Sequence, residues 1–394
     1  MSATPTAPIH LVLAFDHPLN AVESVADALA AGLAALGQAP RVLSLPRDLN
    51  ALASLKPEDV ARVYSLGSVP LTFKIGNQWL WQHFACPVSA YLLDAPIYDI
   101  GRVPAFNRFL ADARLDRRLS LCAPETGYRD WLGSALNVSW HHVPFAPFAA
   151  PDAPLPAAQD VQQRVCVIGT VGSELGGQCD LPLADALRAW FGAEMPPSSA
   201  DDLAAALLAQ EADPLPARQL SQALRWAPQE CLQPQRLKGV LALDSWVKRH
   251  RRLLAVRSLG HLPVDFFGTG WQALLGAQAH HRHVGQVAHQ DIARLMPHYQ
   301  AVLNFDPNWQ GGVHDRVYTA AAMGVPVITN EATPLPALQQ QGAALLSYAS
   351  NRPHLEEHIR AWPAWQAARS PRPPHFGFLA QHNWASRMAL WQAA

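Results

Sequence analysis

Short apolar runs alternate with segments of helical periodicity over the first 150 residues. The apolar run at residues 10–15 predicts a buried strand, and residues 21–36 repeat apolar side chains at helical spacing up to Gly37. Further strands are predicted at residues 41–45, 62–66, 88–93 and 119–122, and further helices at residues 77–84, 104–113 and 125–132. Because strands that alternate with helices form a parallel sheet covered on both faces, residues 1–150 predict an α/β domain.

The alternation resumes after a segment that is dense in proline and alanine. Residues 146–158 cannot form a regular helix or a central strand, which places a domain boundary at residue 150. Strands are then predicted at residues 164–168, 264–267, 301–305, 325–329 and 344–348, with a mostly helical stretch at residues 181–259. We therefore predict a second α/β domain over residues 151–377 with a helical insert.

The terminal segment, residues 378–394, predicts one amphipathic helix that ends near residue 392. It carries Phe378, Trp384, Met388 and Trp391 among polar residues. Because such an apolar stripe docks on a neighbouring surface, we expect this helix to return toward the N-terminal domain and tie the two domains together.

Composition narrows the classes of function. The 394 residues are 49% apolar and 15% charged with a net charge of -1, which excludes a small single module and a general coat for nucleic acid. The N-terminus has no cationic region of a signal peptide, and no apolar stretch approaches the roughly 18 residues of a spanning helix. Five scattered cysteines without a CxxC pair fit a reduced compartment. We predict a cytoplasmic protein, and its arginine, alanine and proline content indicates a bacterial source.

The most informative stretch is a glycine-rich turn that opens a helix. A strand ends at Asn304, a loop with Gly311 and Gly312 follows, and a helix is predicted to start near residue 313 or 314. Free N–H groups and the positive end of the helix dipole at such a turn suit a diphosphate. His314 and Arg316 in the first turn add donors, although an ordinary corner with a solvated arginine explains the pattern equally well.

The run GGVHDRVYTAAAMGVPVITNE at residues 311–331 is similar to the nucleotide-sugar motif of group 1 glycosyltransferases. It most closely resembles the CgeB-like (spore-maturation-type) branch. The similarity covers roughly the last 130 residues and includes Gly285, Val287 and the closing QHNWASRMALW. The resemblance implies a GT-B fold, in which two Rossmann-like domains face a central cleft. It implies that the C-terminal domain binds the nucleotide-sugar donor and that Asn304 and Asp315 belong to the donor site.

Two positions depart from the family pattern. The family usually has a glutamate where this chain has Thr319, and the acidic residue expected eight positions earlier is Gly311. The resemblance implies that this glutamate binds the donor ribose. Because threonine cannot supply a charge-assisted pair of hydrogen bonds, an altered donor or an inactive descendant is an alternative.

Two further loops follow predicted strands of the second domain. Gly169 and Thr170 follow the strand at residues 164–168, and Gly268 and Gly270 follow the strand at residues 264–267. Neither spacing matches the dinucleotide fingerprint, so plain tight turns are one interpretation. The resemblance implies the other, in which these loops approach the phosphate and the base or ribose of the donor.

Candidate catalytic side chains in the first domain come directly after strands, where open α/β sheets place their ligands. Asp94 is our first choice for the base that deprotonates an acceptor hydroxyl, and Asp16 or His17 is the second. Helix capping or turn formation explains any single one of them more simply. Lys74 and Asn77 precede a predicted helix and either meet an acceptor or phosphate, or cap that helix.

Two charged clusters are expected to have no special role. The basic run WVKRHRR at residues 246–252 is interpreted as a solvated helix face rather than a surface for nucleic acid or anionic lipid. His280, His281 and His283 lack nearby cysteines or paired carboxylates, so no metal is predicted.

Together with these patterns, the resemblance implies a metal-independent, hexosyltransferase-like glycosyltransferase of glycan biosynthesis. It would move a sugar from a nucleotide-diphosphate donor to a hydroxyl of a glycan, a lipid-linked sugar or a protein, without a further cofactor. Peripheral contact with a membrane is compatible with the sequence, and no nucleic-acid partner is expected. The alternatives are a non-catalytic GT-B scaffold that binds a nucleotide or a partner, and a nucleotide-sugar epimerase.

Overall fold

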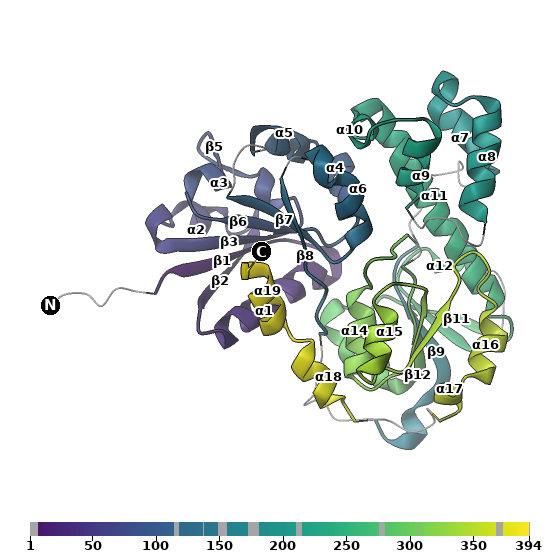
Figure 1. Cartoon of the computed structure of the whole chain (residues 1–394). Coiled ribbons are helices and arrows are strands. Elements are labelled where there is room, and N and C mark those ends of the chain that lie inside the picture. The colour runs from purple at the N-terminus through teal and green to yellow at the C-terminus, as the bar shows by residue number, and fades with distance from the viewer. Residues whose placement is uncertain are drawn as a thin grey trace. The chain divides into compact units, whose positions relative to one another are not determined.

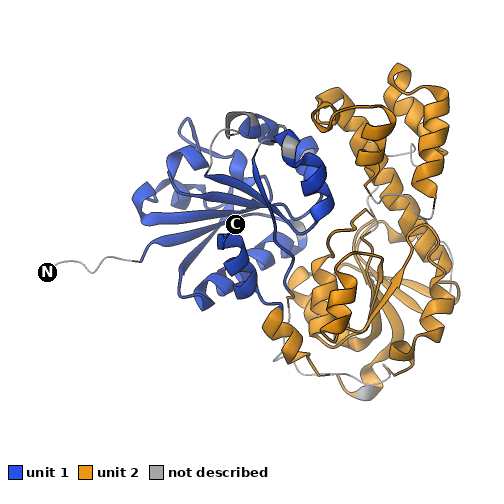
Figure 2. Ribbon diagram, in the orientation of Figure 1, with its two compact units in different colours: residues 1–146, 382–394 blue, residues 147–381 orange. Residues whose placement is uncertain are grey.

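The chain forms two compact units, which are shown in Figures 1 and 2. Unit 1 comprises residues 1–146 and 382–394, and unit 2 comprises residues 147–381. The computed structural model describes residues 7–113, 118–136, 138–148, 156–171, 181–209, 215–275, 280–306, 308–367 and 373–393.

Unit 1 is built on a six-stranded parallel sheet with the order β2-β1-β3-β6-β7-β8. The strands are β1 (Ile9–Phe15), β2 (Ala39–Leu45), β3 (Val60–Leu66), β6 (Val88–Tyr91), β7 (Leu119–Ala123) and β8 (Ser139–His142). The helices are α1 (Ala21–Ala35), α2 (Leu49–Ala53), α3 (Leu80–His83), α4 (Pro96–Arg102), α5 (Pro104–Ala113), α6 (Thr126–Leu136) and α19 (Trp384–Ala393). The strand order reverses between β1 and β3, so the ends of these two strands border the usual ligand position of such sheets.

Only the second half of the segment predicted as a helix at residues 77–84 is helical. A short antiparallel hairpin, β4 (Lys74–Ile75) and β5 (Gln78–Trp79), occupies its beginning, and only Leu80–His83 are helical. Gly76 adopts a φ of 60° in the hairpin turn, a left-handed conformation that glycine takes without steric cost. Asn77 therefore lies in the turn of a hairpin and does not cap a helix.

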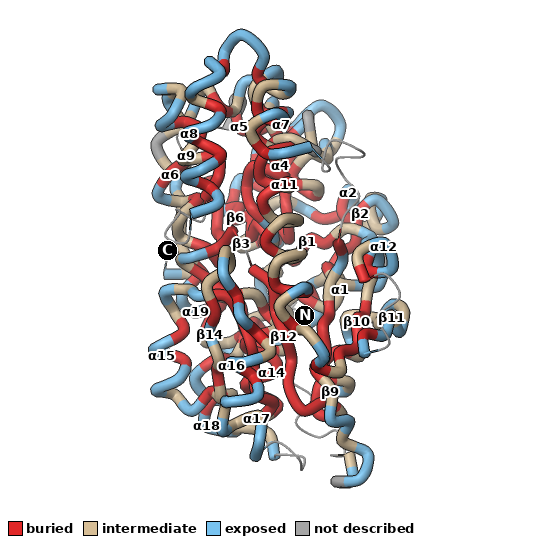
Figure 3. Tube along the Cα trace, turned by 90° about the vertical axis from the view of Figure 1, so that its right-hand side faces the viewer, coloured by how far each residue is buried: buried red, intermediate tan, exposed pale blue. Residues whose placement is uncertain are grey.

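Unit 2 contains a second six-stranded parallel sheet with the order β11-β10-β9-β12-β13-β14. The strands are β9 (Gln162–Ile168), β10 (Val264–Phe267), β11 (His281–Gly285), β12 (Tyr299–Leu303), β13 (Val327–Asn330) and β14 (Leu345–Tyr348). In order along the chain this is 3-2-1-4-5-6, the Rossmann arrangement, and its switch point lies between β9 and β12. In Figure 3 the strands of both sheets are mostly buried.

The helices of unit 2 fall into two groups. The predicted insert between β9 and β10 is a bundle of α7 (Leu183–Phe191), α8 (Pro197–Leu208), α9 (Pro216–Ala223), α10 (Pro228–Cys231) and the long α11 (Pro234–Ser258). The other helices are α12 (Trp271–Leu275), α13 (Ile292–Leu295), α14 (Asp315–Ala322), α15 (Leu335–Gln340), α16 (Leu355–Ala361), α17 (Pro363–Ala367) and α18 (Phe376–Gln381). Short single-turn 3-10 segments connect several elements.

The terminal segment forms two helices rather than the single one predicted. α18 belongs to unit 2, and α19 belongs to unit 1, where it packs on α1. Residues 382–383 are not helical and separate α18 from α19. Asn383 caps the start of α19, because its Oδ1 accepts a hydrogen bond from the Ser386 N–H at 2.8 Å. The contact of α19 with α1 is close, because a Cβ atom at Gly32 would lie 2.7 Å from the carbonyl carbon of Trp384.

His382, at this break, is expected to make unit 1 sensitive to acid. Burial and the adjacent Arg387 guanidinium lower the pKa of His382 to about 4, and Arg387 donates a hydrogen bond to its Nδ1 at 2.6 Å. Because the unfolded chain binds a proton near pH 6.5 and the folded chain does not, the free energy of unfolding should fall by up to about 1.4 kcal/mol per pH unit between pH 6.5 and 4. Urea unfolding of His382→Gln, which keeps an acceptor but does not titrate, should lack this slope. An equal slope in both proteins would contradict the assignment.

Candidate functional site

The loops at the carboxyl ends of β9, β10 and β12 lie at one edge of the sheet of unit 2, beside its switch point, and the loop after β12 leads to the N-terminus of α14. The loop after β9 carries Gly169 and Thr170, the loop after β10 carries Gly268 and Gly270, and the loop after β12 begins with Asn304. A ligand of an open α/β sheet binds at this position. Every predicted donor-binding residue thus lies on an element of one unit.

A buried hydrogen-bond network fixes the corner between β12 and α14. Asn304 donates from Nδ2 to Asp306 Oδ2 at 2.7 Å and to Thr329 Oγ1 at 3.1 Å. Asp306 Oδ2 also accepts the backbone N–H of His314 at 2.9 Å, and the Asp306 backbone exchanges hydrogen bonds with the side chain of Asn330 at 2.7 and 2.8 Å. Asp306 is therefore the carboxylate that holds the start of α14, and the sequence analysis did not identify it.

Arg316 is held by this network. Its Nε donates to Asn304 Oδ1 at 3.3 Å, and the residue is half-buried in the first turn of α14. Among the residues that the structure describes, no carboxylate lies within ion-pair distance of its guanidinium. A positioned cation at a helix N-terminus is suited to bind an anion.

Asp315 places a second charge at the same helix end, between two histidines. His289 contacts Asp315 Oδ2 through Nε2 at 3.1 Å, and His314 contacts the other carboxylate oxygen through Nδ1. Burial alone raises the pKa of Asp315, but the charges and hydrogen bonds of His314 and His289 outweigh it and hold that pKa well below its usual value. The His314 ring stacks on Trp309 with centroids 5.9 Å apart, so its orientation is set from two sides.

Gly268 allows the loops after β9 and β10 to touch. It has a φ of 117°, and a Cβ atom there would lie 1.9 Å from the carbonyl oxygen of Gly169. Trp271 Nε1 donates to the same oxygen at 2.7 Å. A Cβ atom at Gly270 would likewise lie 2.0 Å from the carbonyl oxygen of Val171, so this close approach requires glycine at both positions.

Thr319 lies in the second turn of α14, where its side chain is already engaged. It is buried, and its hydroxyl accepts a hydrogen bond from the backbone N–H of Phe148 at 3.0 Å. The Phe148 ring packs edge-on against His289, with ring centroids 4.7 Å apart. Gly311 and Gly312 precede α14, which begins at Asp315, one or two residues later than predicted.

The candidate bases of unit 1 are exposed side chains at strand ends. Asp16 accepts a hydrogen bond from Ser44 Oγ at 2.7 Å and lies 3.5 Å from a guanidinium nitrogen of Arg47. His17 is exposed, with its ring against Phe15. Asp94 is exposed after β6 and accepts the N–H of the following residue at 2.7 Å, just before α4.

Unit 1 contains two further polar groups at or near candidate positions, the hairpin residues Lys74 and Asn77 and a buried pair after β3. The Lys74 ammonium lies 4.3 Å from the ring centroid of Trp79, and Asn77 is exposed in the same hairpin. Ser68, which is buried just after β3, donates from its backbone N–H and its hydroxyl to Asp99 Oδ1 at 3.1 and 2.5 Å. This Ser68–Asp99 pair borders the switch point of unit 1 and was not predicted.

The basic run at residues 246–252 is not a solvated face. Arg251 is 3% exposed, and the Lys248 ammonium lies 3.4 Å from the buried carboxylate of Asp244. Arg252 Nη1 donates to the carbonyl oxygen of Thr170 at 3.0 Å, in the candidate site. The signal in the sequence was the dense positive charge within a long helix, but only the fold reveals which side chains turn inward.

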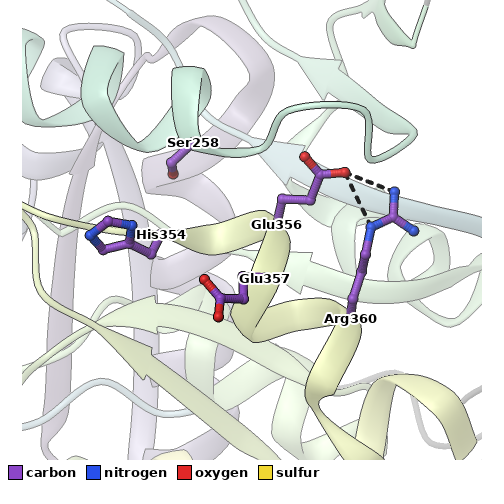
Figure 4. Close-up of a pocket in the computed structure, with 5 residues that line it drawn as sticks. All are labelled: Ser258, His354, Glu356, Glu357 and Arg360. Carbon is purple, nitrogen blue, oxygen red and sulfur yellow. Dashed lines mark hydrogen bonds and ion pairs between the residues drawn. The ribbon is translucent and has the colours of Figure 1, made fainter.

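A separate hollow of about 420 Å³ lies elsewhere in unit 2, and Figure 4 shows it. It is lined by Ser258, His354, Glu356, Glu357 and Arg360, none of which belongs to the corner described above. Within the described ranges, no group of three or more His, Cys, Asp or Glu side chains is arranged to hold a metal ion. Nor does any helix there have the length and apolarity to cross a bilayer.

Two six-stranded parallel sheets in successive units, the second in Rossmann order, define the GT-B fold. Residues 249–393 match the sequence model of a family described as glycosyl transferase-like. No curated protein matches the chain in sequence.

Solved structures that resemble the chain include an α-glucosyltransferase (AGT) in complex with UDP, at 9% identity and a TM-score of 0.54, with 98% of this chain and 99% of that chain covered. AviGT4, a glycosyltransferase of avilamycin A biosynthesis, has 13% identity, a TM-score of 0.48 and coverage of 98% and 96%. Anabaena HepE with UDP and glucose has 11% identity, a TM-score of 0.48 and coverage of 98% and 99%. At these identities the likeness concerns the fold.

Proposed function

We propose that this protein is a glycosyltransferase that moves a hexosyl group from a nucleotide-diphosphate donor to a hydroxyl group of an acceptor. The observation that carries the proposal is the Arg316 guanidinium, which has no carboxylate partner among the described residues and is held by Asn304 at the N-terminus of α14. This corner lies within residues 249–393, the part of the chain that matches the glycosyl transferase-like family.

In the proposed reaction, unit 2 stabilises the leaving diphosphate. The acceptor oxygen attacks the anomeric carbon, the bond from that carbon to the phosphate oxygen breaks, and negative charge develops on the diphosphate. Arg316, His314 and the N–H groups at the start of α14 are proposed to neutralise that charge, and the contact that holds Arg316 at this helix end supports the assignment. Because these are protein cations and amides, the step is proposed to need neither a metal ion nor another cofactor. The loops after β9 and β10 are proposed to bind the rest of the donor.

Unit 1 is proposed to handle the acceptor. Asp94 is the first candidate for the base that receives the proton of the acceptor hydroxyl, and Asp16 or His17 is the second. Lys74 and Asn77 are candidates for contact with the acceptor or a phosphate. A glycan, a lipid-linked sugar or a protein fits the proposal as acceptor, and we place the protein in a bacterial cytoplasm.

A panel of nucleotide sugars tests the proposal directly. UDP-sugars come first, because the α-glucosyltransferase of similar fold holds UDP, and GDP-, ADP- and CMP-sugars follow. Donor cleavage that increases when an acceptor is added supports transfer. Isomerisation of the donor sugar without an acceptor would instead identify an epimerase, and a wild-type chain that neither binds nor cleaves any donor would overturn the proposal.

The surroundings of Thr319 favour a second candidate, a scaffold that binds a nucleotide or partner without turnover. Its hydroxyl already accepts the Phe148 N–H, and it replaces the glutamate that the family pattern has at this position. The same panel separates the two candidates, because a scaffold binds the nucleotide but leaves the donor intact at every acceptor concentration.

A further inference from the structure

Two adjacent arginines of α11 reach three loops of unit 2. Arg251 donates from Nε to Asn351 Oδ1 at 3.1 Å and from Nη1 to Asn308 Oδ1 at 3.2 Å. Asn351 lies in the loop after β14, and Asn308 lies in the loop after β12. The next residue, Arg252, donates from Nη1 to the carbonyl oxygen of Thr170 in the loop after β9, at 3.0 Å.

The loop after β12 is tied to α11 at a second point. Asn308, which is fully buried, donates from Nδ2 to the backbone oxygen and to Oδ1 of Asp244 at 3.0 and 2.8 Å. Asp244 and Arg251 lie about two turns apart on α11, so one helix clamps Asn308 from two sides. The next residue, Trp309, stacks on His314 at the start of α14. This contact connects the clamped Asn308 to the corner between β12 and α14, where the donor is proposed to bind.

The clamp also reaches a second helix of the insert, α8. Asn351, which accepts from Arg251, donates from Nδ2 to the carbonyl oxygen of Ala209 at the end of α8. Burial of Arg251 and Asp244 on one helix costs desolvation free energy. Lys248 of the same helix offsets part of the cost for Asp244, and hydrogen bonds to the side-chain amides of the two loops offset more of it while the loops keep this geometry. Movement of these loops would therefore leave more of the desolvation cost of the buried charges on α11 without compensation.

We propose that Arg251 and Arg252 are positioning residues of the donor site, and that α11 thereby makes the geometry of the loops after β9 and β12 depend on the helical insert. The inference rests on the proposed function, because it assigns the two loops to donor binding. Neither arginine needs to touch the donor. Arg252 orients the backbone after β9, and Arg251 sets the segment that leads to His314.

Arg252→Ala is the variant that tests the inference, with Arg257→Ala as the matched control on the same helix. Arg252 is only half-buried, so its removal should leave the fold intact, and Arg257 is exposed. In the free protein, hydrogen exchange at Gly169 and Val171, whose N–H groups bond to the carbonyl oxygens of Phe267 and Thr269, should accelerate at least about fivefold in Arg252→Ala only. With nucleotide, the Kd for UDP and the donor KM should rise about tenfold while kcat changes little.

A conservative variant separates positioning from general destabilisation. Lysine at residue 252 can donate one hydrogen bond to the Thr170 carbonyl, so Arg252→Lys should recover most of the exchange protection and part of the UDP affinity. If Arg252→Ala and Arg257→Ala show equal exchange and equal Kd while the wild type binds UDP, the inference is wrong and the proposed function stands. If the loop loosens in Arg252→Ala but the wild type binds no nucleoside diphosphate, the clamp exists, and both its role in donor binding and the proposed function are wrong.

Discussion

Arg316→Ala is expected to lower kcat/KM about a hundredfold, equivalent to about 2.7 kcal/mol of transition-state stabilisation. The charge on the leaving diphosphate grows as its bond to the sugar breaks, so a fixed cation at that place acts more strongly on the transition state than on the bound donor. Arg316 meets this requirement because Asn304 orients it and no described carboxylate pairs with it. Steady-state kinetics with the donor identified by the panel measure the loss.

Two companion variants make this result specific. Arg316→Lys keeps the charge but not the planar fork of donors, so its kcat/KM should lie between those of the wild type and Arg316→Ala. Arg294→Ala removes an arginine whose side chain is 67% exposed and should change kcat/KM less than twofold. A loss of less than about tenfold in Arg316→Ala, with the fold intact, would remove Arg316 from the reaction.

The strands that could be predicted from the sequence are mostly those with neighbours on both sides. Most of the apolar runs, such as residues 10–15 or 264–267, lie inside a sheet and are largely buried, whereas the runs at residues 41–45 and 344–348 form the edge strands β2 and β14. The two strands of the main sheets that were missed, β8 and β11, are edge strands with the polar sequences SWHH and HRHVG. Each of these two strands pairs through its backbone with one neighbour, and its polar sequence offers no hydrophobic pattern to detect.

In the candidate site, too, only the part that is local in the sequence could be predicted. Asn304, His314, Asp315 and Arg316 lie within 13 consecutive residues, so a local motif could predict that they act together. The contacts of Arg252 with Thr170 and of Thr319 with Phe148 join residues 82 and 171 positions apart. No local pattern indicates which distant partner a side chain meets, because that depends on how strands and helices pack.

The docking of α19 on unit 1 should depend on one aromatic side chain. Trp391 is 1% exposed, and its ring centroid lies 5.2 Å from that of Tyr64 and 5.3 Å from that of Tyr91. The following residue, Gln392, donates to the Tyr64 hydroxyl at 2.8 Å and exchanges hydrogen bonds with Gln38. Of the apolar side chains predicted to dock, Trp384, Met388 and Trp391 are therefore part of the core of unit 1, whereas Phe378 belongs to unit 2.

Trp391→Ala is expected to lower the free energy of unfolding of unit 1 by about 3–5 kcal/mol, because the loss of a fully buried indole leaves a cavity between α19 and the sheet. Leu390→Ala is the matched control on the same helix. Leu390 is 50% exposed, so its truncation should cost no more than about 0.5 kcal/mol. Urea unfolding followed by hydrogen exchange in β3 and β6 measures the change within unit 1. Equal stabilities of the two variants would show that α19 adds little to the core, whereas the expected difference would mean that unit 1 is complete only when the last residues of the chain have folded onto it.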